Sequence, residues 1–253
     1  MVCAPNRPNS GLWVTPVFTP VGTHTTEEYI MKPKVYVETT IISYLTAKPS
    51  RDLVIAAHQQ ITLDWWETRR EAFDLFVSEL VIREAGAGDE AAAQKRLDAL
   101  EEIPLLELNE EVLDLAKVLV EKGSIPERAK EDALHIALAT VHGMDYPITW
   151  NCRHIANAEM RKGLALGCIT QGYEALLSPF RKNLWGSNTM WKDPIVEEVR
   201  RIREAHAARF DYDLKAIYED LRKTERQSGR RVVTLPPKRL KERQGELASG
   251  GSR

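Results

Sequence analysis

The stretch Lys34-Val35-Tyr36-Val37-Glu38-Thr39-Thr40 decides how the rest of the chain is interpreted. Its apolar and β-branched residues predict a buried strand, and polar residues follow at once. Glu38 therefore stands at the carboxyl end of that strand, where open parallel sheets form their ligand sites. A helix N-terminal role, favoured by the helix dipole, is the alternative interpretation of Glu38.

Short apolar segments and helical segments alternate after this strand. Further strands are predicted at residues 73–78, 105–108 and 146–149, with an edge strand at residues 168–171. Helices are predicted at residues 52–70, 79–85, 89–102, 110–121 and 127–141. This alternation predicts an α/β fold in which helices flank both faces of a parallel sheet.

The chain of 253 residues is long enough for one domain with extensions. We expect a disordered extension over residues 1–31, the α/β domain over 32–180 and a linker over 181–190. A helical segment follows over residues 191–238, and a disordered basic tail over 239–253. Within that segment, Asp193-Pro194 begins one helix, a second runs from Asp213 to Arg226, and residues 231–235 are extended.

Composition places the chain among soluble globular proteins, with 43% hydrophobic and 28% charged residues. No apolar run approaches the roughly 18 residues that span a bilayer, and residues 1–30 lack the pattern of a signal peptide. We therefore expect a cytoplasmic protein with no membrane partner. Cys3, Cys152 and Cys168 lie far apart without a CxxC pair, so we interpret them as reduced thiols.

Charge is divided unevenly along the chain. Residues 1–180 hold 17 basic against 26 acidic side chains, and residues 181–253 hold 18 against 11. An acidic body does not attract a polyanion by its bulk charge, so RNA binding would require local patches or metal ions. Residues 181–253, the basic segment, can instead dock on residues 1–180, the acidic body.

Four oxygen-bearing side chains are predicted to meet at one end of the sheet. Glu38 follows the first strand, and Glu84 lies about a helical turn and a half beyond the second strand. Asn151 follows the strand at residues 146–149, and Asp132 lies on the helix that precedes that strand. Carboxylates without Cys or His favour magnesium over zinc, and such an ion can hold a phosphate and activate water. Without other evidence, Glu84 is better interpreted as a solvated charge on a helix than as a ligand. Asn151 is as well suited to bracing a loop as to contacting metal or phosphate.

Helical spacing separates neighbouring residues near Asp132. Asp132 and Ile136 are four residues apart and share a face, which predicts that Asp132 points inward. Glu131 shares its face with His135, so we interpret Glu131 as a surface residue. His135 and His154 are interpreted as structural rather than catalytic.

Four segments, in order, resemble the motifs of PIN domains of the VapC toxin type, over residues 32–180. They are Val35-Tyr36-Val37-Glu38-Thr39-Thr40, Leu80-Val81-Ile82-Arg83-Glu84, Glu131-Asp132-Ala133-Leu134-His135-Ile136-Ala137 and Thr149-Trp150-Asn151. The resemblance implies a PIN-like fold, an RNA substrate, a homodimer, and a toxin controlled by an antitoxin. It also implies a magnesium-dependent endoribonuclease, with manganese as a substitute, in which Glu38, Glu84 and Asp132 hold the metal and Asn151 assists it or the phosphate.

Two departures from the family pattern affect this expectation. Glu38 stands where the family usually has aspartate, and its side chain is longer by one methylene. Asn151 stands where the family often has aspartate, and it lacks the charge, which would weaken a second metal site. A catalytically silent PIN-fold regulatory or RNA-binding module is therefore the alternative.

The segment from Trp191 to Lys238 is similar to small antitoxin proteins. The similarity implies a nuclease fused to its own inhibitor, so that the antitoxin-like partner acts in cis, or else in trans. We expect Arg200, Arg230 or Arg231 to reach the acidic cluster and displace metal. The alternatives are an oligomer or partner contact, nucleic-acid binding, a DNA-binding autorepressor, and translation through a former stop codon.

Overall fold

The computed structural model describes residues 31–122, 125–152, 155, 160–174 and 193–240. The predictions for residues 1–30, for the linker at 181–190, for residues 241–253 and for His154 lie outside this range. The described residues from Lys32 onward belong to one compact unit.

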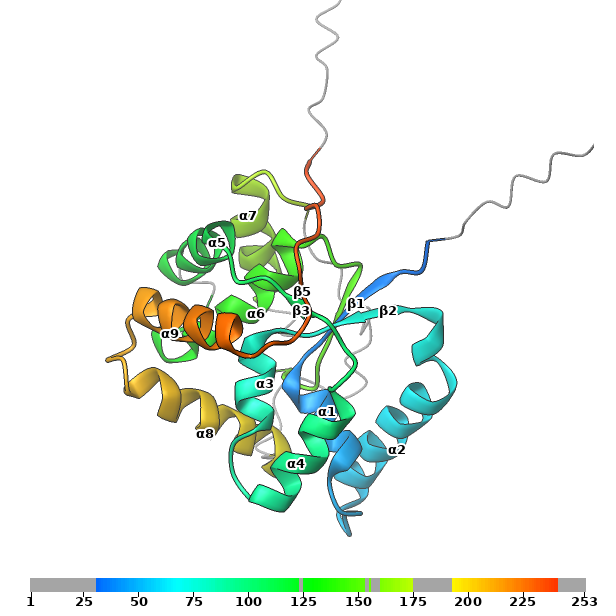
Figure 1. Cartoon of the computed structure of the whole chain (residues 1–253). Helices are drawn as coiled ribbons and strands as arrows, with labels where there is room; N and C mark the ends of the chain where they lie inside the picture. Colours follow the sequence, from blue (N-terminus) through cyan, green and yellow to red (C-terminus); the bar gives the residue numbers. More distant parts are fainter. Residues whose placement is uncertain (1–30, 123–124, 153–154, 156–159, 175–192, 241–253) are drawn as a thin grey trace, which may run out of the picture. The chain divides into compact units, whose positions relative to one another are not determined.

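A three-stranded parallel sheet lies at the centre of this unit (Figure 1). Its strands are β1 (Lys34–Val37), β2 (Asp74–Phe76) and β4 (Tyr146–Ile148), in the order β2-β1-β4. All pairs are parallel, with Val35 opposite both Leu75 and Tyr146. The predicted α/β class is confirmed, and the carboxyl ends of all three strands face the same edge.

Helices connect and cover these strands. Their bounds are α1 (Thr39–Thr46), α2 (Leu53–Thr68), α3 (Glu79–Ala85), α4 (Glu90–Ala99), α5 (Glu110–Glu121), α6 (Lys130–Val141) and α7 (Arg161–Thr170). Asp52, Asp89 and Asn109 cap the starts of α2, α4 and α5 with side-chain oxygens, which explains why those predicted starts are accurate. In the described part of the chain, no helix is long and apolar enough to cross a membrane.

The predicted edge strand at residues 168–171 is wrong. Cys168 lies in the last turn of α7, and Gln171 caps that helix. Leu164, Gly167 and Cys168 face the core, and a Cβ atom at Gly167 would lie 2.7 Å from Leu119 Cδ2. Close packing of α7 on α5 therefore selects a helix, which a short apolar run alone does not distinguish from a strand.

The core lies between the sheet and helices α5 and α6. Every residue of α6 from Glu131 to Val141 is buried. Leu113, Leu115 and Leu119 of α5 are buried in the same apolar cluster as Val35 and Val37 of β1. This core fixes the start of α6, and with it Asp132, relative to the end of β1.

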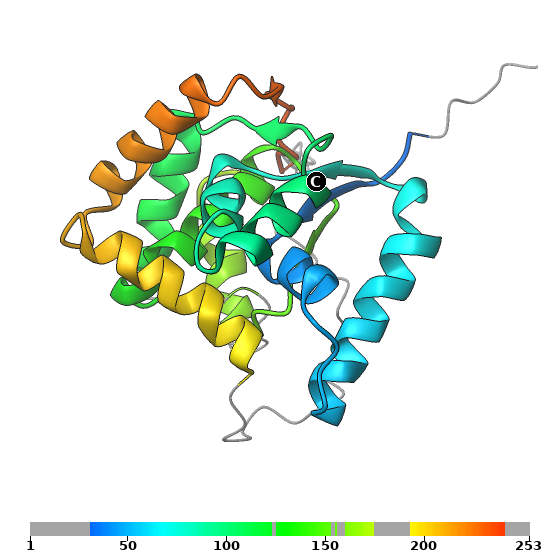
Figure 2. The ribbon, with the colours of Figure 1, turned by 60° about the horizontal axis from the view of Figure 1, so that its bottom comes forward.

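The C-terminal segment packs on the body. It consists of α8 (Pro194–Ala208), α9 (Leu214–Gln227) and β5 (Val232–Val233), close to the predicted elements. Helix α8 contacts α1, α3 and α6, and α9 contacts α3 and α5, as the yellow and orange helices of Figure 2 illustrate. Strand β5 pairs in parallel with β3 (Leu105–Leu106), so the segment also joins the body by backbone hydrogen bonds.

Candidate functional site

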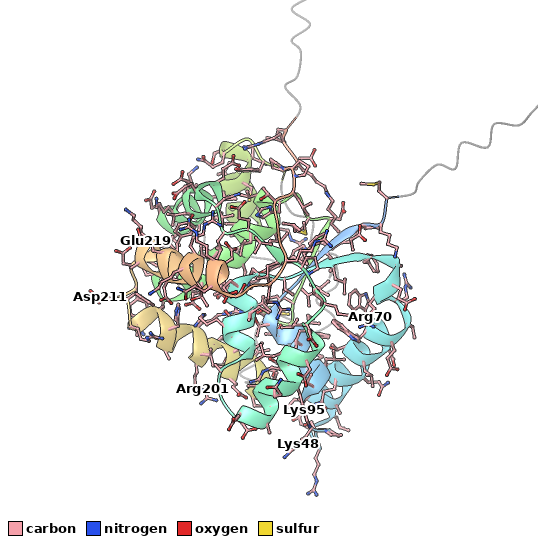
Figure 3. The ribbon with its side chains drawn as sticks, in the orientation of Figure 1. Lys48, Arg70, Lys95, Arg201, Asp211 and Glu219 are labelled. Carbon is pink, nitrogen blue, oxygen red and sulfur yellow. The ribbon has the colours of Figure 1, made fainter. Side chains whose placement is uncertain are left out.

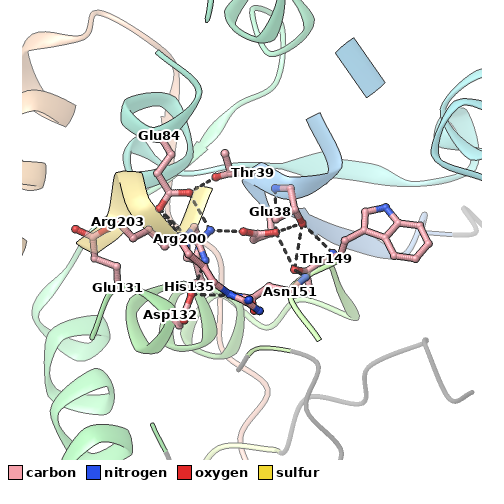
Figure 4. Close-up of polar contacts among 12 residues, drawn as sticks. Glu38, Thr39, Glu84, Glu131, Asp132, His135, Thr149, Asn151, Arg200 and Arg203 are labelled. Atoms are coloured by element: carbon pink, nitrogen blue, oxygen red, sulfur yellow. Dashed lines mark hydrogen bonds and ion pairs between the residues drawn. The ribbon is translucent and has the colours of Figure 1, made fainter. Parts of the chain in front are cut away.

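Arg203 of α8 lies in the middle of the acidic cluster (Figure 4). Its Nε and Nη2 atoms donate to the two oxygens of Glu84 at 2.8 and 2.9 Å. The same guanidinium forms ion pairs with Glu38 and Asp132. All four side chains are buried, so the structure brings the three predicted carboxylates together around one positive charge.

Each carboxylate lies at or near one end of a helix. Glu38 caps α1 and accepts a hydrogen bond of 3.0 Å from the Thr40 backbone N–H. Asp132 lies in the first turn of α6, and Glu84 lies near the end of the short helix α3. Glu38 can therefore cap the helix and belong to the site at once, because Oε2 accepts from the helix N-terminus and Oε1 pairs with Arg203.

Threonine hydroxyls hold the carboxylates in place. Thr149 donates to Glu38 Oε2 at 2.7 Å, and Thr40 donates to the same oxygen. Thr39 donates to Glu84 Oε2. The other oxygen of Glu38, Oε1, is thereby directed at the guanidinium. Thr39, Thr40 and Thr149 adjoin predicted site residues in the sequence, and their positioning role is visible only in the folded chain.

His135 also lies in the site, although the sequence favoured a structural role for it and it was not counted among the site residues. Its Nε2 atom lies 3.1 Å from Glu84 Oε1, and its Nδ1 atom lies 2.7 Å from the Tyr36 hydroxyl. Ligand atoms of Glu38, Glu84 and His135 all lie within 4.8 Å of one another. His135 follows Asp132 by three residues on α6, a spacing that places the two side chains on one side of a helix and was available from sequence.

Asn151 braces the site from its edge. Its Nδ2 atom donates to Asp132 Oδ1 at 3.0 Å, and its Oδ1 atom accepts from Arg200 Nη2 at 2.9 Å. Its backbone N–H donates to Thr149 Oγ1 at 2.8 Å. The bracing interpretation of Asn151 agrees with these contacts, which occupy both ends of its amide.

The surface interpretation of Glu131 is wrong. Glu131 is buried, with one oxygen 2.5 Å from Arg83 Nη2 and the other 2.5 Å from His206 Nδ1. The Nε2 atom of His206 lies 3.2 Å from Asp220 of α9. Helix α8 covers the face of α6 that would otherwise be solvated, and spacing along α6 alone contains no information about that cover.

The expected arginines are replaced by one that was not named. Arg230 donates to the carbonyls of Leu100 and Glu101, and Arg231 is exposed. Arg200 reaches Asn151 and Glu197 of its own helix rather than the carboxylates of the cluster. A signal for Arg203 exists in the sequence: it shares one helical face with the buried residues Val196, Val199 and His206. Figure 3 labels the contrasting Arg201, which is exposed on the outer side of the same helix.

The charges of the site stabilise one another. Burial alone would raise the pKa of Glu84, but Arg203 and His135 outweigh it and hold that pKa well below its usual range. Burial would lower the pKa of Arg203, and the three carboxylates raise it instead. Burial, with the nearby glutamates, raises the pKa of Tyr36, so its hydroxyl stays protonated beside His135. Glu84 and Arg203 therefore depend on their partners to remain ionised.

The residues present fit a divalent cation. Three carboxylates converge on one guanidinium, so their oxygens already surround a single cationic position. Glu38, Glu84 and His135 provide two oxygens and one nitrogen at ligand distance from one another, and Asp132 lies beside them. Such a mixed set suits manganese as well as magnesium, because imidazole is a poorer ligand for the harder ion.

The fold and the site together define an α/β protein with a buried carboxylate cluster closed by α8 of its C-terminal segment. Comparisons with protein-family models, with curated proteins and with solved structures find no match to this chain.

Proposed function

We propose that this protein is a metal-dependent endoribonuclease of the PIN toxin type, held inactive by its own C-terminal segment. One observation carries the proposal: Arg203 of that segment pairs with all three carboxylates that the sequence nominates for metal binding. A divalent ion and this guanidinium would require the same oxygens, so the closed arrangement excludes the ion.

In the open state, Glu38, Glu84 and Asp132 would hold the metal, with His135 as a further ligand. Such an ion positions a phosphodiester and lowers the pKa of an attacking water. Thr39, Thr40 and Thr149 keep the carboxylate oxygens in fixed orientations, which reduces reorganisation during the reaction. No side chain is required as a nucleophile, and the RNA substrate and antitoxin-like segment follow from the PIN resemblance.

The charge of the segment supports the inhibitory role. Residues 181–253 carry a net charge of +7, opposite in sign to the body at −9. Removing one partner of a buried ion pair costs roughly 3–5 kcal/mol, because the remaining charges lose their compensation. The position of α8 is therefore sensitive to the loss of one arginine.

A catalytically silent regulatory or RNA-binding module is the second candidate. It is favoured by Asn151, which offers no charge, and by a covalently attached arginine that pairs with all three carboxylates of the cluster. This candidate predicts RNA binding without metal-dependent cleavage.

The test compares the full chain with its Arg203→Ser variant, using a mixed structured RNA with Mg²⁺, Mn²⁺ or EDTA. We expect the variant to cleave RNA about 100-fold faster or more, since about 3 kcal/mol of lost closure shifts the open fraction by that factor. EDTA should stop the reaction.

Arg201→Ser is the matched control, because Arg201 is exposed on the same helix. It should leave cleavage at the level of the unchanged chain, and Asp132→Asn added to Arg203→Ser should abolish cleavage. A folded Arg203→Ser variant that binds RNA and does not cut it with either metal would favour the silent module.

A further inference from the structure

A second apolar cluster lies beside the acidic site, apart from the main core. Its buried members are Tyr44, Ile55 and Val196, and Trp150 and Ile195 pack against it. Val196 and Ile195 belong to the first turn of α8, whereas the aromatic residues belong to the body. The first turn of α8 therefore covers aromatic side chains, and Arg203, further along the same helix, covers the carboxylates.

Two rings of this cluster, Tyr44 and Trp150, contact each other and the neighbouring ring of His58. The Trp150 indole stacks on the His58 imidazole, with ring centroids 4.0 Å apart and planes 19° apart. The Tyr44 ring lies 5.5 Å from His58 and 5.6 Å from Trp150. The indole face is thus already in contact with a planar nitrogen heterocycle.

The plane of Trp150 is fixed by hydrogen bonds. Its indole Nε1–H donates to Thr62 Oγ1 at 2.9 Å, and its backbone N–H donates to Thr40 Oγ1 at 2.8 Å. Thr40 also donates to Glu38, so one hydroxyl connects the backbone of Trp150 to the acidic site. A fixed aromatic plane loses little conformational entropy when it stacks on a ligand.

Trp150 is joined to the carboxylates through both of its sequence neighbours. Thr149 donates to Glu38 at 2.7 Å, and Asn151 donates to Asp132 at 3.0 Å. Asp193, which caps α8, accepts a hydrogen bond from the Tyr44 hydroxyl and lies 3.7 Å from His58 Nδ1. The rings and the carboxylates are therefore joined through neighbouring residues, and the same helix, α8, contacts both.

We propose that Tyr44, His58 and Trp150 form the nucleobase-stacking platform for a single-stranded RNA nucleotide next to the cleaved phosphate. This inference rests on the proposed function and specifies its substrate as unpaired RNA. Unpaired bases stack on aromatic side chains with little dependence on sequence, whereas bases inside a duplex are inaccessible to such a ring. Helix α8 blocks the platform and the metal ligands together, which makes it a competitor for both parts of the substrate.

The test measures RNA binding separately from cleavage. Fluorescein-labelled single-stranded RNA is titrated with the full-length Arg203→Ser variant in Ca²⁺, and fluorescence anisotropy is recorded for intact RNA and for oligonucleotides with one abasic nucleotide at each position in turn. We expect one or two adjacent abasic positions to weaken binding about 5- to 100-fold. Adding Trp150→Ala should weaken binding of intact RNA by a similar factor and remove the dependence on abasic position.

Trp150→Phe in the same background keeps an aromatic face and should retain most of the binding and the position dependence. Trp65→Ala is the matched tryptophan deletion, since Trp65 lies on the same helix as His58 but packs on Phe73. It should leave the position dependence intact.

A flat abasic scan, no binding of any oligonucleotide, or an unchanged scan after Trp150→Ala would overturn the platform. A preference for duplex or for a peptide competitor over the single strand would do the same. If Arg203→Ser cleaves RNA in Mg²⁺ but the abasic scan is flat, the platform is wrong and the proposed nuclease function stands. If binding depends on the abasic position but no RNA is cleaved, the platform stands and the nuclease function is wrong.

Discussion

The body and the C-terminal segment are held in place by different forces. The body is organised around fully buried aliphatic side chains of β1, α5 and α6, whose burial is insensitive to charge. The segment adds fewer apolar residues to that core, mainly Leu214, Ile217 and Leu221, and places Arg203 and His206 among buried carboxylates.

This difference means that the segment can respond to conditions that leave the body unchanged. Apolar packing of α9 holds one part of it, and ion pairs of α8 hold the other. Ion pairs depend on protonation, on competing cations and on the presence of every partner, whereas apolar burial does not. A site closed by charge can be opened without unfolding the domain that contains it.

Leu115→Ala and Leu221→Ala separate the two regions most strongly. Both leucines are fully buried, the first in α5 and the second in α9, so each truncation should lower the free energy of unfolding by about 2–5 kcal/mol. Under the proposed function, only Leu221→Ala should also raise RNA cleavage, because it loosens the segment. Denaturant unfolding and Mg²⁺-dependent cleavage measure the two effects, and an equal rise in cleavage for Leu115→Ala would contradict the distinction.

Glu79 makes the contact between α3 and α9 dependent on pH. It is buried, its Oε2 atom has no hydrogen-bond partner among the described residues, and burial, with Glu225 of α9 adding to it, raises its pKa to about 7. The folded chain then holds this proton at pH values where the unfolded chain has lost it. Its stabilising contribution is complete below the ordinary glutamate pKa and is lost as the pH rises through about 7.

We therefore expect Glu79→Gln to flatten this part of the pH dependence. Relative to the variant, the unchanged chain should lose on the order of 1–3 kcal/mol of unfolding free energy between about pH 5 and pH 8. Urea unfolding across that range measures the difference. Glu219→Gln, at an exposed position of α9, is the control, and identical slopes for all three chains would rule out Glu79 as the titrating group.

Lys238→Ala should have the smallest effect. Its Nζ atom lies 2.5 Å from Asp145 Oδ1, but both side chains are more than one third exposed, so the pair contributes about 0.2–1 kcal/mol. Raising the ionic strength should reduce that difference, because salt screens exposed charges. Thermal unfolding at low and high salt is the measurement, and a loss well above 1 kcal/mol would show that exposed pairs also hold the segment.

Local sequence signals predicted much of the fold. Asp52, Asp89 and Asp193 were correct helix starts because a capping side chain acts within its own first turn. The strand before Glu38 was equally clear, since a continuous apolar run fits a strand buried on both faces. At residues 168–171 the same kind of evidence failed, because a segment of only four residues fits a helix end as well as a strand.

The candidate site was predictable in part. Glu38, Glu84 and Asp132 meet as expected, because their positions follow from the ends of parallel strands and the helices beside them. Glu131 was misjudged and the contact of His135 with Glu84 was not foreseen, since their surroundings come partly from α3 and, for Glu131, from His206, 75 residues further along the chain.

The sequence by itself determined the α/β alternation, the acidic residues and the two C-terminal helices, because periodicity, caps and strand ends are properties of neighbouring residues. Only the tertiary structure decided that Arg203, rather than Arg200, Arg230 or Arg231, enters the acidic cluster. The physical reason is that the docking angle of α8 depends on burial and charge summed over the whole interface with α1, α3 and α6. No local pattern contains that sum.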